Sequence, residues 1–226
     1  MAAQTTPIVF LLDVDNTLID NDALKAHIEA TLRSAGGEAL ARRFWEIYEA
    51  VRADLDTVSV PITLERLRRE APDPRSIDEL GRRLFASPFA SFVYPGALEL
   101  LAWLRGRGLP VILSDGDPWF QAKKITDAGL GAAVEGHVLI FFHKEQHIAD
   151  ILRWYPAERY VIVDDKARLL ALLEQRFAQA GFGDKVRTVW VRQGHYAVDE
   201  GVDERAAPDD TIASIAELRA LLARAV

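Results

Sequence analysis

The sequence contains no cysteine among its 226 residues. This absence excludes thiol nucleophiles, disulfides, iron–sulfur clusters and zinc sites built from thiolates. Any nucleophile or metal ligand must therefore come from oxygen or imidazole side chains.

The chain also lacks an excess of positive charge. Its 34 acidic residues outnumber 27 basic residues, and the formal net charge is −7. Without a global positive field it has little attraction for a phosphate backbone, so we expect no nucleic-acid partner. Half of the residues are hydrophobic and 27% are charged, which is the balance of a folded globular protein. The length allows a core domain with a smaller accessory domain.

Long hydrophobic runs are missing as well. The first apolar run, residues 8–12, is far shorter than a membrane span and lacks the basic flank of a signal peptide. We therefore expect no membrane partner, a cytoplasmic location and a monomer or homodimer.

Short apolar runs nevertheless alternate with helical stretches over most of the chain. Such runs are typical of strands that are buried on both faces of a parallel sheet. Their alternation with helices predicts an α/β fold with a mainly parallel sheet sandwiched by helices. The predicted strands are residues 8–12, 109–113, 138–142, 160–163 and 186–191, and the predicted helices of this part include residues 96–107, 144–154 and 166–180.

The segment between the first strand and Tyr94 has helical periodicity and no convincing buried strand. We interpret residues 20–90 as an inserted all-α helical bundle, and residues 1–19 and 91–226 as the core domain. The crossings at residues 19–21 and 89–95 are candidate hinges. The predicted helices of the insert are residues 22–34, 38–53, 63–70 and 76–85, with turns at Gly36-Gly37, Pro61 and residues 72–74.

Polar residues follow four of the predicted strands, where a parallel sheet binds its ligands. Carboxylates gathered there from different strands would repel one another unless a divalent cation lay between them. With oxygen ligands only, Mg²⁺ is the expected ion, and a hydroxyl and an ammonium complete a pocket suited to phosphate. The residues concerned are Asp13, Asp15 and Thr17, then Ser114, Asp115 and Gly116, then Lys144, and finally Asp164 and Asp165.

These residues resemble a known set of motifs. The run Asp13-Val-Asp15-Asn-Thr17 is similar to the Asp-x-Asp-x-Thr motif of the haloacid dehalogenase (HAD) superfamily of phosphohydrolases. Ser114 resembles its second motif, Lys144 its third, and Asp164-Asp165 its fourth, in the same order. The resemblance implies a Rossmann-like HAD core, and the helical insert is similar to a C1-type cap. Four motifs in order are far more specific than any one of them.

The resemblance implies a Mg²⁺-dependent phosphohydrolase that acts on a small phosphorylated metabolite. Asp13 would attack phosphorus and form an aspartyl-phosphate. Asp15 would protonate the leaving oxygen and then deprotonate the hydrolytic water, so we expect its pKa to be raised. Lys144 would offset the charge of the nucleophile and the transferring group.

The remaining motif residues would bind substrate or metal. Thr17 would help to position Asp15, and Ser114 would bind a phosphoryl oxygen, with Asp115 and Gly116 assigned to the same substrate-binding loop. Mg²⁺ would be held by Asp13, the backbone carbonyl of Asp15, and Asp164 or Asp165. The double acid leaves the fourth-motif ligand open, with Asp164 favoured. For the third motif, Lys123 and Lys124 compete with Lys144, which is better placed.

Several alternatives stay open. A phosphomutase would use the same residues, as would other HAD-type hydrolases, whereas a dehalogenase is disfavoured because a leaving halide does not need the acid Asp15. A binding or regulatory protein that has lost turnover would fit the unusual fourth motif. Phosphonate cleavage would need a cap lysine, and Lys25 is the single lysine of the insert. His195, after the last strand, is interpreted as a structural loop residue.

Overall fold

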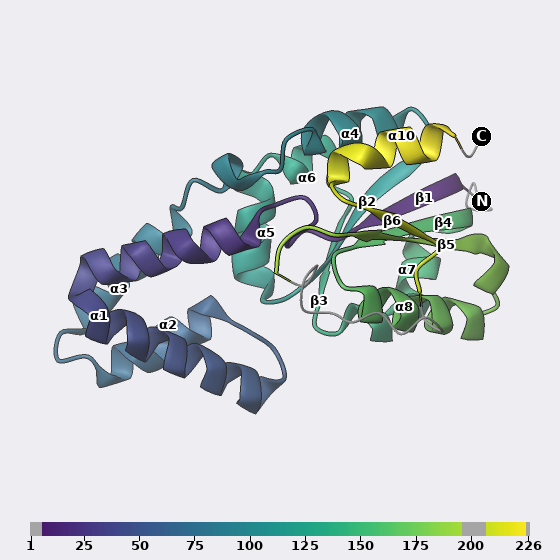
Figure 1. Cartoon of the computed structure of the whole chain (residues 1–226). Helices are drawn as coiled ribbons and strands as arrows, with labels where there is room; N and C mark the ends of the chain where they lie inside the picture. Colours follow the sequence, from purple (N-terminus) through teal and green to yellow (C-terminus); the bar gives the residue numbers. More distant parts are fainter. Residues whose placement is uncertain (1–5, 196–206, 225–226) are drawn as a thin grey trace.

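The computed structural model describes residues 6–195 and 207–224. Six strands form one sheet in the order β3-β2-β1-β4-β5-β6, and every neighbouring pair is parallel (Figure 1). The predicted α/β fold is confirmed. The strands are β1 (Thr6–Leu12), β2 (Leu109–Asp115), β3 (Val138–Phe141), β4 (Ala157–Asp164), β5 (Val186–Val191) and β6 (Asp210–Ile212).

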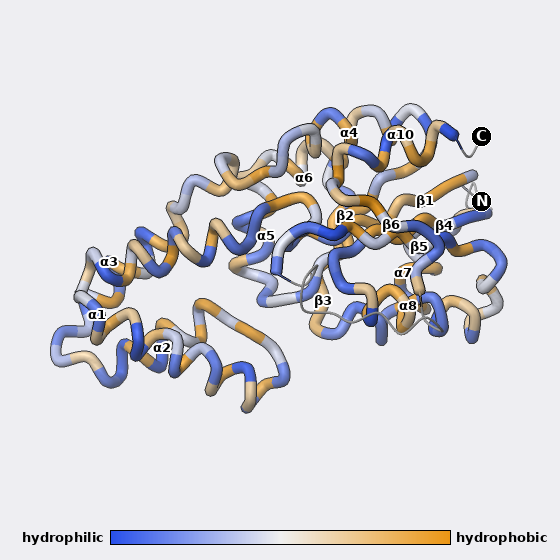
Figure 2. Tube along the Cα trace, in the orientation of Figure 1, coloured by the Kyte–Doolittle hydropathy of each residue, from blue (hydrophilic) through white to orange (hydrophobic). Residues whose placement is uncertain are grey.

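Helices cover both faces of the sheet. Alternate side chains of β1 pack on opposite faces of the sheet. Phe10 and Leu12 belong to one buried cluster, and Val9 and Leu11 belong to the other. Burial on both faces explains why these strands are continuous apolar runs, which Figure 2 shows as hydrophobic segments at the centre of the sheet. Helices α4 (Ala97–Arg105), α5 (Pro118–Asp127), α6 (Leu130–Ala133) and α10 (Leu218–Ala223) pack on the first side, and α7 (Ile148–Trp154) and α8 (Ala167–Gln179) on the second.

Strand β6 was not predicted from the sequence. Its three residues contain a single buried apolar side chain, Ile212, which is too little for a periodic signal. The strand is instead anchored by polar contacts to β5. The Thr188 backbone N–H donates to Asp209 Oδ2 at 2.7 Å, and Arg187 Nε donates to Asp210 Oδ2 at 2.6 Å.

The insert forms a helical cap beside the sheet (Figure 1). It consists of α1 (Asn21–Leu55), α2 (Val60–Glu70) and α3 (Pro74–Phe85), followed by the short 3₁₀ helix η1 (Phe89–Phe92). Helix α1 is interrupted at Gly36 and Gly37, which have non-helical backbone angles, so its two arms match the two helices predicted on either side of this pair. The division of the chain at residues 20 and 90 stays a prediction.

The two segments that join the cap to the core are hydrogen-bonded to each other. Ile19 and Val93 form an antiparallel bridge. The Asp20 N–H donates to Phe92 O at 2.8 Å, and the Tyr94 N–H donates to Leu18 O at 2.9 Å. Any hinge motion must therefore move both crossings together.

Three predicted helices have different limits in the structure. Helix α2 begins earlier than predicted because the Ser59 hydroxyl caps it, accepting from the Ile62 N–H at 3.3 Å. Helix α3 also begins earlier than predicted, because Asp73 Oδ1 accepts from the Arg75 N–H at 3.1 Å. The predicted helix 144–154 is broken into the 3₁₀ helix η2 (Lys144–Gln146) and α7. Two further 3₁₀ helices are η3 (Gly183–Lys185) and η5 (Ile215–Glu217). Within residues 6–195 and 207–224, no helix is both long and apolar enough to cross a membrane.

Gly108 allows the chain to enter β2 close against β1. A Cβ atom at this position would lie 2.4 Å from the Ile8 carbonyl oxygen, whereas one at Gly106 would meet Trp103 O at 3.5 Å. We expect Gly108→Ala to lower the free energy of unfolding by about 2 kcal/mol, because the backbone of β1 would have to shift. Gly106→Ala is the matched control, with a change within about 0.5 kcal/mol. Urea denaturation measures both, and equal losses would contradict the steric account.

Candidate active site

The carboxyl ends of the strands bring the predicted motif residues to one edge of the sheet. Asp13 follows β1, Ser114 lies near the end of β2, and Asp164 ends β4. Lys144 begins η2, just beyond β3. All four side chains are at least 95% buried, so they lie beneath the surface.

Lys144 lies between two of the carboxylates. Its ammonium Nζ donates to Asp13 Oδ1 and to Asp164 Oδ2, both at 2.7 Å, and to Leu113 O at 3.2 Å. Burial alone would lower the pKa of this ammonium, but the charges of Asp13 and Asp164 outweigh it and hold the pKa above its usual value. Lys144 is therefore a fixed positive charge at neutral pH.

The Asp115 side chain positions Lys144 by binding the Lys144 backbone N–H. Asp115 Oδ1 accepts from the Lys144 N–H at 2.8 Å. The preceding residue, His143, has a left-handed conformation (φ 58°), which turns the chain at that point. Asp115 was predicted to bind substrate; in the structure it borders the cavity and also holds the loop that carries Lys144.

A third carboxylate, Asp165, completes a buried acidic cluster. One ligand oxygen from each of Asp13, Asp164 and Asp165 lies within 4.8 Å of the others. The two Asp164 oxygens already accept hydrogen bonds, from Lys144 Nζ at 2.7 Å and from the Lys166 N–H at 2.9 Å. By contrast, Asp13 Oδ2 and both Asp165 oxygens are buried without a hydrogen-bond partner in the described chain.

The electrostatics of this cluster favour a bound cation. Burial, with the neighbouring charges of Asp164 and Asp13, raises the pKa of Asp165 to about 9. Burial also raises the pKa of Asp13 to about 6, against the opposing effect of Lys144. Unpartnered buried carboxylate oxygens are the donors that a hard divalent cation takes. Asp13 and Asp165 therefore offer unpartnered oxygens to a cation, whereas both oxygens of Asp164 are already engaged.

Asp15 is held by two residues of α5. Gln121 Nε2 donates to Asp15 Oδ2 at 3.0 Å, and the Lys124 ammonium forms an ion pair with Asp15 Oδ1. Burial raises the pKa of Asp15, but Lys124 and Gln121 more than offset it, so the pKa lies below its usual value. The expectation of a raised pKa is wrong for this arrangement, because the sequence did not indicate that Lys124 would face Asp15.

Gln121 was missed from the sequence altogether. Its Nε2 also lies 3.0 Å from Ser114 Oγ and 2.9 Å from Asp115 O, so it joins the first and second motifs. Gln121 and Lys124 are one helical turn apart on α5, which begins directly after the second motif. That i,i+3 spacing was the available signal. Gly116 lies in the same loop, with φ of 133°, and borders the cavity.

Thr17 of the first motif and His195 after β5 are two further residues singled out in the sequence. Thr17 is fully buried, and its hydroxyl has no hydrogen-bond partner in the part of the chain described, so no such bond joins it to Asp15. His195 reaches the start of α1, because its Nδ1 lies 2.6 Å from Asp22 Oδ1 and its N–H donates to Asp22 Oδ2 at 2.8 Å. These contacts agree with a structural interpretation of His195.

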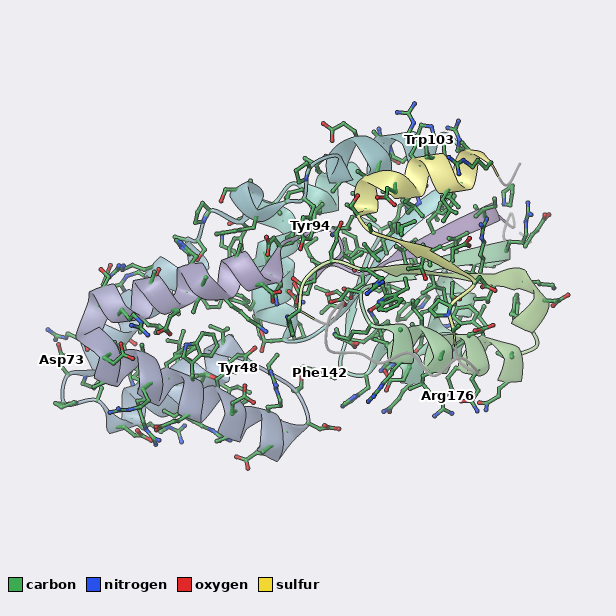
Figure 3. All side chains as sticks on the ribbon, viewed as in Figure 1. Tyr48, Asp73, Tyr94, Trp103, Phe142 and Arg176 are labelled. Carbon is green, nitrogen blue, oxygen red and sulfur yellow. The ribbon has the colours of Figure 1, made fainter. Side chains whose placement is uncertain are left out.

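A cavity of about 410 Å³ lies where the cap faces the core. Asp15, Gly116 and Asp165 border it from the core, and Tyr48 from the cap. Figure 3 shows Tyr48 on the cap and Phe142, another lining residue, on the facing edge of the core. Asp15, the loop after Ser114 and Asp165 thus face a largely apolar cap surface across this cavity.

Polar contacts join the cap to the core near this cavity. Ser59 Oγ donates to Asp117 Oδ2 at 2.6 Å, and both residues are buried. Nearer the surface, His143 Nε2 lies 3.4 Å from Asp56 Oδ2. Since Ser59 caps α2 and Asp117 caps α5, the first contact joins the beginnings of two helices in different parts of the chain.

Comparison with known families agrees with this geometry. Residues 10–154 match the family model described as haloacid dehalogenase-like hydrolase. The chain belongs to the haloacid dehalogenase-like hydrolases. The resemblance inferred from the four motifs is therefore confirmed, and the HAD-like chain is assigned as a hydrolase. Among curated proteins, none matches it.

Solved structures show the same HAD fold. A haloacid dehalogenase-like hydrolase from Burkholderia xenovorans LB400 is 41% identical, with a TM-score of 0.84, and the match covers 96% of this chain and 97% of the other. A HAD hydrolase from Bacillus subtilis, bound to magnesium, is 16% identical with a TM-score of 0.64, covering 96% and 98%. An L-2-haloacid dehalogenase from Xanthobacter autotrophicus is 17% identical with a TM-score of 0.59, covering 95% and 98%.

The unpartnered carboxyl of Asp165 predicts an unusual stability profile. With a folded pKa of about 9 and an unfolded pKa near 3.8, the folded state holds more protons between these values, so stability falls as pH rises through that window. At pH 8 in EDTA, Asp165→Asn should melt at least about 3 °C above the unaltered protein. Added Mg²⁺ should raise the melting temperature of the unaltered protein but not of the variant.

The control for this comparison is Asp184→Asn, which changes an exposed carboxylate in η3. It should leave both the pH profile and the Mg²⁺ response as they are. Thermal melts followed by circular dichroism at pH 5 and pH 8 measure all three proteins. A lower melting temperature for Asp165→Asn in EDTA at pH 8 would contradict the account.

Proposed function

We propose that this HAD-like hydrolase is a Mg²⁺-dependent phosphohydrolase of small phosphorylated metabolites that works through an aspartyl-phosphate. The observation that carries the proposal is the pair Asp13 and Asp15 on one loop. Asp13 is held by Lys144 beside an acidic cluster, and Asp15 is held separately by Gln121 and Lys124. Two carboxylates in such different surroundings suit two different roles, nucleophile and proton carrier.

Asp13 serves as the nucleophile. Lys144 binds one of its oxygens and leaves the other, Oδ2, without a partner. A carboxylate is a weak nucleophile, so its fixed position and the neutralisation of charge around it must supply most of the acceleration. The buried Lys144 ammonium provides part of that neutralisation.

Mg²⁺ fits the remaining oxygens of the acidic cluster. Asp13 and Asp165 would hold it, with the Asp15 carbonyl oxygen as the further ligand that the motif implies. When bound, the ion withdraws charge from the phosphoryl oxygens. Support for Mg²⁺ comes from the unpartnered oxygens and from the magnesium bound by the Bacillus subtilis hydrolase of the same fold.

Asp15 carries the proton. In the absence of substrate its carboxylate is paired with Lys124, so it is ionised at neutral pH. A phosphoryl group that binds beside Asp15 adds negative charge, which raises the pKa of Asp15. The phosphoryl group also competes with the Asp15 carboxylate for the Lys124 ammonium. Asp15 can then take a proton, donate it to the leaving oxygen and recover it from the hydrolytic water.

The cavity volume fits a small substrate. A space of about 410 Å³ accommodates one small molecule. A haloacid dehalogenase has the same fold, so the fold alone does not determine which reaction is catalysed. The residues of the site must decide between the two reactions. Asp15 favours phosphate ester cleavage, because an alkoxide leaving group needs a proton and a halide does not.

Removing the nucleophile should abolish turnover. Purified protein should hydrolyse p-nitrophenyl phosphate or members of a panel of metabolite phosphates with Mg²⁺, and lose this activity in EDTA. Asp13→Asn should reduce kcat by at least about 10³-fold, because the amide cannot attack phosphorus. The exposed Asp184→Asn is the matched control. Turnover that survives chelation or Asp13→Asn would contradict the phosphohydrolase proposal, as would hydrolysis of a haloacid but of no phosphate ester.

Removing the proton carrier should have a different effect. With Asp15→Asn and an aryl phosphate, whose leaving group needs little protonation, phosphate should transfer to Asp13 and remain there. Intact-mass spectrometry after an acid quench should find the mass of one added phosphoryl group. The adduct should be missing from Asp13→Asn. If Asp15→Asn turns over as fast as the unaltered protein, Asp15 is not the acid and base.

A further inference from the structure

The basic residues of the cavity differ in whether they have an acidic partner. Lys25, Arg52, Lys124 and Lys166 border it. Lys124 pairs with Asp15, and Arg52 Nη1 lies 3.3 Å from Glu49 Oε2. The charges of Asp164, Asp13 and Asp165 hold the pKa of Lys166 above its usual value despite its burial, so it too lies close to carboxylates.

Lys25 has no such partner. It lies in the first turns of α1, is half-buried, and makes no hydrogen bond or ion pair with the rest of the described chain. The chain as a whole is acidic, with a net charge of −7, so an ammonium without a carboxylate is not explained by a shortage of acids. A partly desolvated ammonium that borders a cavity would be stabilised by a bound anion.

The wall around Lys25 is apolar and partly aromatic. Ile28, Phe44 and Tyr48 come from the same helix, α1, and border the same cavity. Burial raises the pKa of Tyr48 to about 12, so its phenol is neutral at physiological pH. This wall suits an uncharged body of a ligand. The charged cap residues that border the cavity are Lys25, the Glu49-paired Arg52, and Asp56, whose exposed carboxylate lies 3.4 Å from His143 Nε2.

We propose that the substrate is a phosphate monoester that carries a second anionic group, a carboxylate or a second phosphate, and that Lys25 binds this group. The scissile phosphate lies at Asp13, and the uncharged body lies against Ile28, Phe44 and Tyr48. This inference rests on the proposed phosphohydrolase function and adds to it the class of substrate.

The test compares aryl phosphates that differ at one position. para-Carboxyphenyl phosphate has a second anion, para-carbamoylphenyl phosphate is its neutral near-isostere, and the bisphosphate of hydroquinone has a second phosphate. If Lys25 binds the second anion, one of the two anionic esters should have a kcat/KM at least about 10-fold higher than that of para-carbamoylphenyl phosphate. The better of the two anionic esters then identifies the group. Lys25→Met should bring this ratio close to one, and Lys25→Arg should restore it in part.

The matched control is Lys185→Met, which alters an exposed lysine beside Phe182, far along the chain from the cap. It should keep both the rates and the ratio. A ratio near one in the unaltered protein would overturn the assignment of Lys25. So would a ratio that survives Lys25→Met while both rates fall together, since that result would place Lys25 at the scissile phosphate.

A binding measurement separates this inference from the proposed function. Calorimetry with the non-hydrolysable para-carboxyphenyl and para-carbamoylphenyl phosphonates, and with phenylene bisphosphonate, gives the same comparison without turnover. If no ester is hydrolysed but an anionic phosphonate binds at least about 10-fold more tightly in a Lys25-dependent way, the phosphohydrolase proposal fails and the anion site stands. Equal binding of all three phosphonates overturns the anion site.

Discussion

The buried ammonium of Lys144 is the interaction on which the rest of the site depends. It joins carboxylates from two strands, Asp13 after β1 and Asp164 at the end of β4, and is itself placed by β2 through Leu113 O and Asp115. The charge of Lys166 acts on the same cluster, yet Asp13 Oδ2 and both Asp165 oxygens keep no hydrogen-bond partner in the described chain. The parallel sheet thus gathers buried carboxylate oxygens that the described side chains do not all satisfy. Under the proposed function, a divalent cation and a substrate phosphate would complete this site.

A second network fixes Asp15 apart from Asp13. Gln121 and Lys124 on α5 hold Asp15, and the same Gln121 contacts Ser114. Helix α5 also contacts the cap through Asp117 and Ser59. One helix therefore connects Asp15, the second motif and the cap, so that movement of the cap and the position of Asp15 are physically linked. Because Ile19 and Val93 form an antiparallel bridge, the two segments that join the cap to the core would move together.

Much of the fold was predictable because the governing signals are local. Strands buried on both faces are continuous apolar runs, and Gly36-Gly37 interrupts α1 where the sequence indicated a turn. Strand β6 was missed because its pairing depends on Asp209 and Asp210, side chains that carry no strand signal of their own. The motif residues were placed at one edge by topology alone. By contrast, the roles of Gln121, Lys124 and Asp165 depend on where side chains point, which spacing does not determine.

Lys144 pairs with Asp13 and Asp164, and the Asp165 carboxyl is left without a hydrogen-bond partner in the described chain. The central claim is that a divalent cation binds this Asp165 carboxyl. Isothermal titration of metal-free protein with Mg²⁺ at pH 7, in buffers of different ionisation enthalpy, counts the protons released on binding. Because the pKa of Asp165 is raised to about 9, the account predicts release of about one proton per Mg²⁺, and none from Asp165→Asn. Tight binding without proton release, or equal release from the variant, would contradict it.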